Sequence, residues 1–138
     1  YNLKMSRLYS YIYQQEGLDF AVVHSLDGYD EISLTSDFKV VNKQGEHIYS
    51  AASFGLPESK QEDLFGGNTP EEASVIFDSV LNNTALPAQK NTVIANAAIA
   101  ILTINPLLSI DEAVDQARVS LESGAALKAF KKFVAINS

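Results

Sequence analysis

Residues 20–34 read FAVVHSLDGYDEISL, a stretch in which an apolar run leads directly into a cluster of acids. The unbroken apolar run of residues 20–23 is typical of a strand that is covered on both faces, as in parallel sheets. Three carboxylates, Asp27, Asp30 and Glu31, then cluster around Gly28. Because ligands of open α/β sheets bind outside the carboxyl ends of the strands, the stretch predicts a cation site at the end of a buried strand.

The segments on either side of this stretch predict an α/β unit. Residues 2–16 have the spacing of an amphipathic helix, with Asn2 as its N-cap and Gly17 at its end. After the acids, residues 32–35 are expected to form a short strand. A hairpin is expected from residues 38–43 and 46–52, with its turn at Gln44-Gly45, and a short helix near residues 58–63. The apolar face expected of the first helix consists of Met5, Leu8, Tyr9 and Ile12.

The second half of the chain predicts helices only. Thr69 followed by Pro70 and Glu72 is typical of a helix start with a capping box, and Ser109 with Glu112 forms a second one. Between them, residues 88–104 are apolar almost all round and predict a buried helix. The inward faces are expected to be Ala73, Ile76, Phe77 and Val80 in the first helix, and Ile110, Ala113, Val114, Ala117 and Leu121 in the third, which ends at Gly124. A last helix is expected over residues 125–134. The expected fold class is α/β, with a few strands that include a hairpin, followed by a helical second half.

Composition limits the function classes. The 138 residues are enough for one domain with a core. A net charge of −7, from 17 acidic against 10 basic residues, argues against a nucleic-acid surface. No apolar run approaches the ~20 residues of a membrane span. There is no cysteine for disulfide or thiol chemistry, and with no visible signal peptide a cytoplasmic location is expected. Because the chain starts at Tyr1 without an initiator methionine, it is interpreted as a piece of a longer protein.

The adjacent carboxylates of Asp30 and Glu31 are the candidate metal ligands. Magnesium keeps several waters and takes only one or two protein carboxylates, together with substrate phosphates. The alternative is a polar turn at Asp27-Gly28 whose acids face water. Weaker candidates have structural interpretations: His24 as a hydrogen-bonded residue, His47 as an exposed one, Gly66-Gly67 as a turn, and Asn96 as a core amide bound to backbone.

Four motifs in register resemble the anthranilate phosphoribosyltransferases. Residues 22–24 and 27–35 (VVH and DGYDEISLT) resemble that family's VVHG-DGLDEISLTG segment. Residues 54–57 (FGLP) are similar to its FGL stretch, residues 63–73 (DLFGGNTPEEA) to its L-x-GG-x-x-x-EN-A segment, and residues 96–98 (NAA) to its NAA helix. Ser25 and Ser36 stand where the family usually has glycine.

The resemblance implies a glycosyltransferase of tryptophan biosynthesis that transfers phosphoribosyl from phosphoribosyl pyrophosphate to anthranilate and uses Mg²⁺. The family's metal-binding pair falls on Asp30 and Glu31. The fold would be the C-terminal part of a nucleoside phosphorylase/phosphoribosyltransferase-type catalytic domain, with residues 1–138 forming a single partial domain. The helical N-terminal domain, the phosphate-binding loop and most contacts to both substrates would precede Tyr1, so the piece alone would be inactive.

Other interpretations stay open at the level of sequence. They are a phosphoribosyltransferase-like protein with a different ligand, a member of the pyrimidine nucleoside phosphorylase group, and an interaction domain without catalysis. The resemblance implies a homodimer for the full-length protein. For the piece alone, we expect self-association, because uncovered helix faces expose apolar surface and uncovered sheet edges expose unpaired backbone groups.

Overall fold

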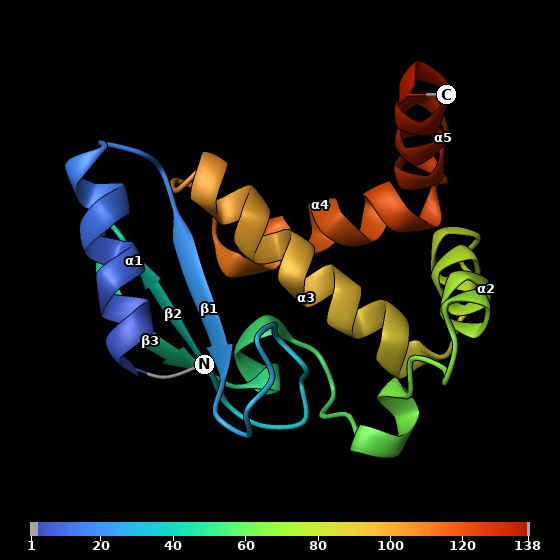
Figure 1. Ribbon diagram of the computed structural model, residues 1–138, viewed down its shortest axis with the longest axis horizontal. Helices are drawn as coiled ribbons and strands as arrows, with labels where there is room; N and C mark the ends of the chain where they lie inside the picture. The colour runs from blue at the N-terminus through green and yellow to red at the C-terminus, as the bar shows by residue number, and fades with distance from the viewer. Residues whose placement is uncertain (1–2, 138) are drawn as a thin grey trace.

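The computed structural model describes residues 3–137, with side chains from Met5 onward. A three-stranded sheet forms the N-terminal part and helices form the rest, as predicted (Figure 1). The elements are α1 (Leu3–Gln15), β1 (Ala21–Ser25), β2 (Phe38–Asn42), β3 (Gly45–Tyr49), the 3₁₀ helices η1 (Ala51–Phe54) and η2 (Gln61–Leu64), α2 (Pro70–Leu81), α3 (Pro87–Ile104), α4 (Ile110–Glu122) and α5 (Ala125–Asn137). The N-cap predicted at Asn2 lies outside the described residues.

The sheet is antiparallel, in the order β1-β2-β3, which corrects the expectation of a parallel arrangement around β1. Val23 pairs with Val40, and Val40 pairs with His47. Within residues 3–137, β1 has a hydrogen-bonded neighbour on one side only. Its residues 21–24 are half-buried because α1 and α3 both contact this strand, which accounts for its apolar run.

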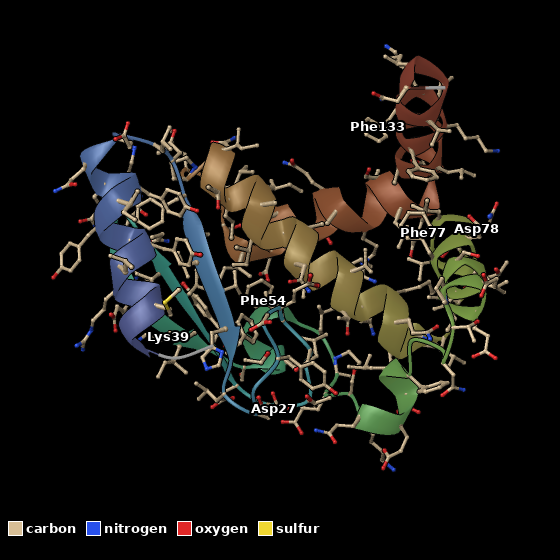
Figure 2. The ribbon with its side chains drawn as sticks, in the orientation of Figure 1. Asp27, Lys39, Phe54, Phe77, Asp78 and Phe133 are labelled. Atoms are coloured by element: carbon tan, nitrogen blue, oxygen red, sulfur yellow. The ribbon has the colours of Figure 1, made fainter. Side chains whose placement is uncertain are left out.

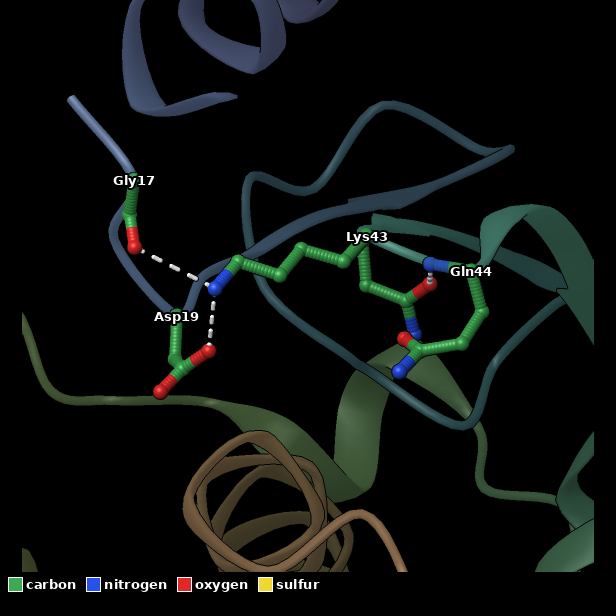
Figure 3. A network of polar contacts seen from close by, with 5 residues as sticks. Gly17, Asp19, Lys43 and Gln44 are labelled. Carbon is green, nitrogen blue, oxygen red and sulfur yellow. Dashed lines mark hydrogen bonds and ion pairs between the residues drawn. The ribbon is translucent and has the colours of Figure 1, made fainter. Parts of the chain in front are cut away.

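The predicted hairpin is confirmed, with its turn one residue earlier than expected. Lys43 and Gln44 form the turn, and Asn42 Oδ1 accepts the backbone N–H of Gln44 at 2.9 Å. The Lys43 ammonium donates to the carbonyl of Gly17 (3.2 Å) and to Asp19 Oδ1 (2.5 Å), as Figure 3 shows. This lysine therefore ties the hairpin to the chain that leads from α1 into β1.

Residues 32–35 do not form the expected strand. Leu34 has a φ of +61°, in the left-handed region that a strand does not contain. The apolar residues here are nevertheless in the core, since the side chains of Ile32 and Leu34 are fully buried. Their alternation in sequence thus reflected burial and not strand pairing. They pack with Phe38, Phe54 and Ile94 in the main hydrophobic cluster.

The helices α3 and α4 complete this cluster. In α4 the predicted face is confirmed: Ala113, Val114, Ala117 and Leu121 are buried and Ile110 packs against them. The Ser109–Glu112 capping box is also confirmed, and the Ser109 backbone N–H, followed by its hydroxyl, lowers the pKa of the Glu112 carboxyl from its ordinary 4.5. The prediction of a buried α3 is wrong for its outer side, where Ile104 is 84% exposed.

Two other helical predictions need correction. The apolar face of α1 is exposed, and α1 buries the small residues Ser6 and Ser10 instead. Such small side chains let a helix approach a sheet closely. At the start of α2, Thr69 Oγ1 accepts the N–H of Glu72 (3.2 Å) as predicted, but the Glu72 carboxylate accepts from the N–H of Asn68 (2.7 Å) and not from Thr69.

The C-terminal helix α5 projects from the body of the molecule (Figure 1) and has no buried residue. Its contact with α2 includes the rings of Phe130 and Phe77, which meet edge to face with centroids 5.0 Å apart. Phe133 lies further out on the same helix (Figure 2). No helix in the described part of the chain is long and apolar enough to cross a membrane.

Candidate functional site: the acidic loop

The predicted metal ligands lie on residues 26–37, the connection between β1 and β2, which we call the acidic loop. The loop closes directly after the strand: the N–H of Ser25 donates to the carbonyl of Tyr29 (3.0 Å) and that of Gly28 to the carbonyl of Ser25 (3.1 Å). Gly28 has a φ of +104°, which glycine adopts without strain. Asp27 lies in this loop at the end of β1, far from Phe133 (Figure 2).

Asn96 fixes the far side of the loop from helix α3. Its Oδ1 accepts the N–H of Ile32 (3.0 Å), and its Nδ2 donates to the carbonyls of Ile32 and Thr92, both at 2.8 Å. Thr92 adds a bond from its hydroxyl to the carbonyl of Ser33 (3.1 Å). The prediction of a structural amide bound to backbone is confirmed. Sequence reasoning missed that the backbone in question belongs to the acidic loop.

Beneath the loop runs a chain of hydroxyl groups. The Ser25 hydroxyl donates to the carbonyl of Glu31 (2.8 Å) and lies 3.2 Å from the Ser33 hydroxyl. Ser33 Oγ is 2.7 Å from Thr35 Oγ1, and Thr35 donates to the carboxylate of Asp27. The Asp27 carboxylate therefore accepts a hydrogen bond from within the loop and is a poor candidate for a metal ligand.

Asp30 and Glu31 both project from the exposed side of the loop. In the described part of the chain, the ion pairs are Lys39 with Glu46 and Lys43 with Asp19, so no lysine neutralises the candidate pair. No set of three acidic or histidine side chains surrounds a common point among these residues. Two hard oxygen donors at the surface fit a magnesium ion that keeps waters and binds substrate phosphate, and do not form a complete protein cage.

The weaker candidates stay apart from the acidic pair. His24 is half-buried on β1 and faces Lys39 across the sheet. His47 is half-buried and not exposed as expected, because its ring stacks on Tyr49 with centroids 5.9 Å apart. Gly67 has a φ of +90° directly before α2, which supports the interpretation of Gly66-Gly67 as a turn.

A cavity of about 410 Å³ opens beside the loop, between η2, α2 and α3. Its walls are mainly apolar and include Tyr29, Phe65, Ile76, Phe77 and Val93, with Glu31 at the polar side. Sequence reasoning missed this cavity. The signal for it was the apolar face of α2, which we expected to be covered: Val80 is buried, Ile76 is half-buried, and Ala73 and Phe77 are exposed toward this space.

Comparison with known proteins places these features in a family. The family model described as "Glycosyl transferase family, a/b domain" matches residues 2–127. Anthranilate phosphoribosyltransferase of Bacteroides thetaiotaomicron is 52% identical over 138 residues, which is 100% of this chain and 42% of that protein. The resemblance seen in the motifs is thus confirmed, and the chain spans about two fifths of the length of such relatives.

Solved structures agree with the sequence match. Anthranilate phosphoribosyltransferase from Thermus thermophilus superposes with a TM-score of 0.75 and 28% identity, covering 83% of this chain and 34% of that one. The enzyme from Saccharomyces cerevisiae in complex with phosphoribosyl pyrophosphate and Mg gives a TM-score of 0.73 at 20% identity, with coverages of 83% and 34%. The latter likeness supports the fold alone. The chain therefore belongs to the glycosyl transferase family, as part of its α/β domain.

Proposed function

We propose that the full-length protein transfers a phosphoribosyl group from phosphoribosyl pyrophosphate to anthranilate, with Asp30 and Glu31 holding Mg²⁺. The observation that carries this proposal is the pair itself: two exposed carboxylates that no lysine of the described residues pairs with, on a loop held by partly buried hydrogen bonds. The 52% identity to a curated anthranilate phosphoribosyltransferase over all 138 residues supports the choice of substrates. By its product, the reaction belongs to tryptophan biosynthesis.

The proposed reaction releases pyrophosphate, which carries negative charge away from the ribose. When bound, the metal ion would neutralise that charge. Asp30 and Glu31 would hold the ion from the protein side. Asn96 and Ser25 keep the backbone of Glu31 and Ile32 in place, so the carboxylates need not be reorganised when the substrate arrives.

The 138 residues supply only part of the catalytic domain in this proposal. The matched relatives are more than twice as long, since this chain covers 42% of the first of them. Groups that hold the ribose, the phosphates and anthranilate belong to the remainder of the protein. We accordingly expect residues 1–138 alone to show no turnover.

The test uses the full-length protein and the variants Asp30→Asn and Glu31→Gln. We expect anthranilate-dependent release of pyrophosphate to fall on the order of 10²-fold in each, because a charge held at the transition state is lost. The control is Glu58→Gln, which removes an exposed carboxylate outside the acidic loop. Wild-type turnover and wild-type Mg²⁺ dependence in both loop variants would refute the metal role. Absence of anthranilate-dependent release by the wild-type protein would refute the substrate assignment.

A further inference from the structure

We propose that Ser25, Ser33 and Thr35 are positioning residues whose hydroxyls set the geometry of the acidic pair. The proposal rests on the proposed function in one respect, namely that Asp30 and Glu31 hold the metal ion. It adds a mechanism by which this chain orients a metal-binding loop that is otherwise exposed to solvent over residues 26–31.

The central observation is a single peptide group held at both of its polar ends. The carbonyl of Glu31 accepts the Ser25 hydroxyl at 2.8 Å, and the N–H of the same peptide group, on Ile32, donates to Asn96 Oδ1 at 3.0 Å. A peptide group is planar, so two bonds at opposite ends fix its orientation. The direction in which the Glu31 side chain leaves the backbone depends on that orientation.

The hydroxyls below this peptide group are buried and have defined roles. Ser25 is 0% and Ser33 is 3% exposed. Each hydroxyl has one hydrogen to donate. Ser25 gives its hydrogen to the Glu31 carbonyl and accepts the N–H of Ser33 at 3.2 Å, while Thr35 gives its hydrogen to the Asp27 carboxylate. Ser33 lies between them and gives its hydrogen to one of the two.

The result is a connection from one end of the loop to the other. Asp27 lies before the candidate pair and the Glu31 carbonyl lies within it, and the hydroxyl chain joins the two. The Asp27 carboxylate holds the Thr35 hydroxyl, the Glu31 carbonyl holds the Ser25 hydroxyl, and the two halves meet at Ser33. Removal of the Ser25 hydroxyl would leave the buried N–H of Ser33 without its acceptor, which destabilises this arrangement of the loop.

The arrangement depends on the serine at position 25, because alanine and glycine have no hydroxyl with which to hold the Glu31 carbonyl. The substitutions Ser25→Ala and Ser25→Gly therefore remove the same hydroxyl in two steric contexts. Ser25→Ala is the variant least exposed to misfolding, because it removes only the hydroxyl oxygen and keeps the Cβ at the end of β1.

The experiment measures binding of Mn²⁺, a hard divalent cation with a paramagnetic signal, to the full-length protein by electron paramagnetic resonance. Both Ser25 variants and Thr35→Val are expected to weaken Mn²⁺ binding roughly 10-fold, the lower end for residues that orient metal ligands. Hydrogen exchange supplies a readout without metal: the amides of Ile32 and Ser33 are expected to exchange faster in both Ser25 variants. In the transferase assay the Mg²⁺ concentration at half-maximal rate should rise, while kcat at saturating Mg²⁺ stays near that of the wild type.

Two controls separate positioning from general loss of stability. Val114→Ala removes buried volume in α4 and lowers stability, but it removes no hydrogen-bonding group of the acidic loop. Ser74→Ala removes a hydroxyl that donates to the carbonyl of Glu71 on α2, outside the acidic loop. Both controls are expected to bind Mn²⁺ like the wild type.

The possible outcomes have distinct meanings. If Asp30→Asn and Glu31→Gln abolish Mn²⁺ binding while both Ser25 variants bind normally, the positioning proposal is overturned and the metal role stands. If the two acidic variants bind Mn²⁺ like the wild type, the metal role fails and the positioning proposal fails with it. Unchanged exchange at Ile32 and Ser33 in both Ser25 variants also overturns the positioning proposal.

Discussion

Asn96 connects two parts of the molecule through one side-chain amide. All three of its hydrogen bonds go to backbone groups, two of them to Ile32 in the acidic loop and one within its own helix. The amide offers one acceptor and two donor hydrogens, and this arrangement uses both kinds. A carboxylate of the same shape has only acceptors, so it cannot replace the amide.

We predict that Asn96→Asp lowers the free energy of unfolding of the full-length protein by about 2–4 kcal/mol at pH 7. The introduced carboxylate would face the carbonyls of Ile32 and Thr92 without a hydrogen to donate, and these acceptors would lose their partner. Chemical denaturation followed by far-ultraviolet circular dichroism measures the loss. Asn91→Asp, on the same helix, is the control, since no side-chain hydrogen bond of Asn91 is found in the described part. Equal stability of the two variants would contradict the role of Asn96.

At the scale of elements, the start of α2 depends on a turn that only glycine fits. Gly67 has a φ of +90°, and a Cβ placed on it would lie 2.7 Å from the Cβ of Glu72 and 3.0 Å from the N of Ala73. At Gly67 the backbone therefore lies very close to the first turn of α2. This proximity lets the Glu72 carboxylate reach the N–H of Asn68.

We predict that Gly67→Ala destabilises the protein by about 2 kcal/mol, because it combines a left-handed backbone with a clash against the helix. Gly66→Ala is the matched control. A Cβ there meets no atom within 4 Å, and Gly66 is not among the glycines with positive φ, so we expect a change near zero or a slight gain. Thermal unfolding of both variants checks the pair, and a Gly66→Ala loss as large as that of Gly67→Ala would contradict it.

Sequence reasoning succeeded for the elements whose signals are local. The Ser109–Glu112 box, the Thr69 cap with Pro70, and the hairpin all depend on residues a few positions apart. It failed where distant contacts decide. The apolar face of α1 is exposed although its spacing is that of a buried face. Residues 32–35 do not pair as a strand, because Ile32 bonds to Asn96 and Leu34 has a left-handed backbone.

The candidate site also has features that the local sequence predicts and features that it does not. The positions of Asp30 and Glu31 on an exposed loop after β1 could be predicted from the local pattern. The hydroxyl chain could not, because serine and threonine carry no periodic signal and their bonding depends on the folded path of the loop. The metal role of the pair stays a prediction.

At the scale of the whole molecule, large apolar side chains are exposed on several helices. Those on α1 include Leu8 (52%) and Ile12 (44%), and Ile104 at the end of α3 is 84% exposed. A second cavity, of about 500 Å³, lies between α1, β1 and α3 and is lined by Phe20, Ile99 and other apolar residues. Several exposed apolar side chains beside an apolar-lined cavity are typical of a face that binds another protein segment.

We predict that the 138-residue polypeptide, prepared by itself, self-associates in a concentration-dependent manner. Sedimentation velocity should show masses above the 15.0 kDa of one chain at micromolar concentration. Ile12→Glu should reduce the association, because it places a charge on the exposed face of α1. Val75→Glu is the control: this valine is also exposed, on α2, but has Glu71 and Asp78 as its neighbours at helical spacing. A monomer at every concentration would contradict the prediction.

The hydrogen bonds between Asn96 and Ile32 join residues that are 64 positions apart. A ribosome that adds roughly 5–20 residues per second takes several seconds to make the intervening chain. Within that interval the last residue of the hairpin is added, and Ser25 and Glu31, which are only 6 positions apart, are both present. The partners that hold the acidic loop therefore become available in two stages, those within the loop first and Asn96 only after α3 has been synthesised.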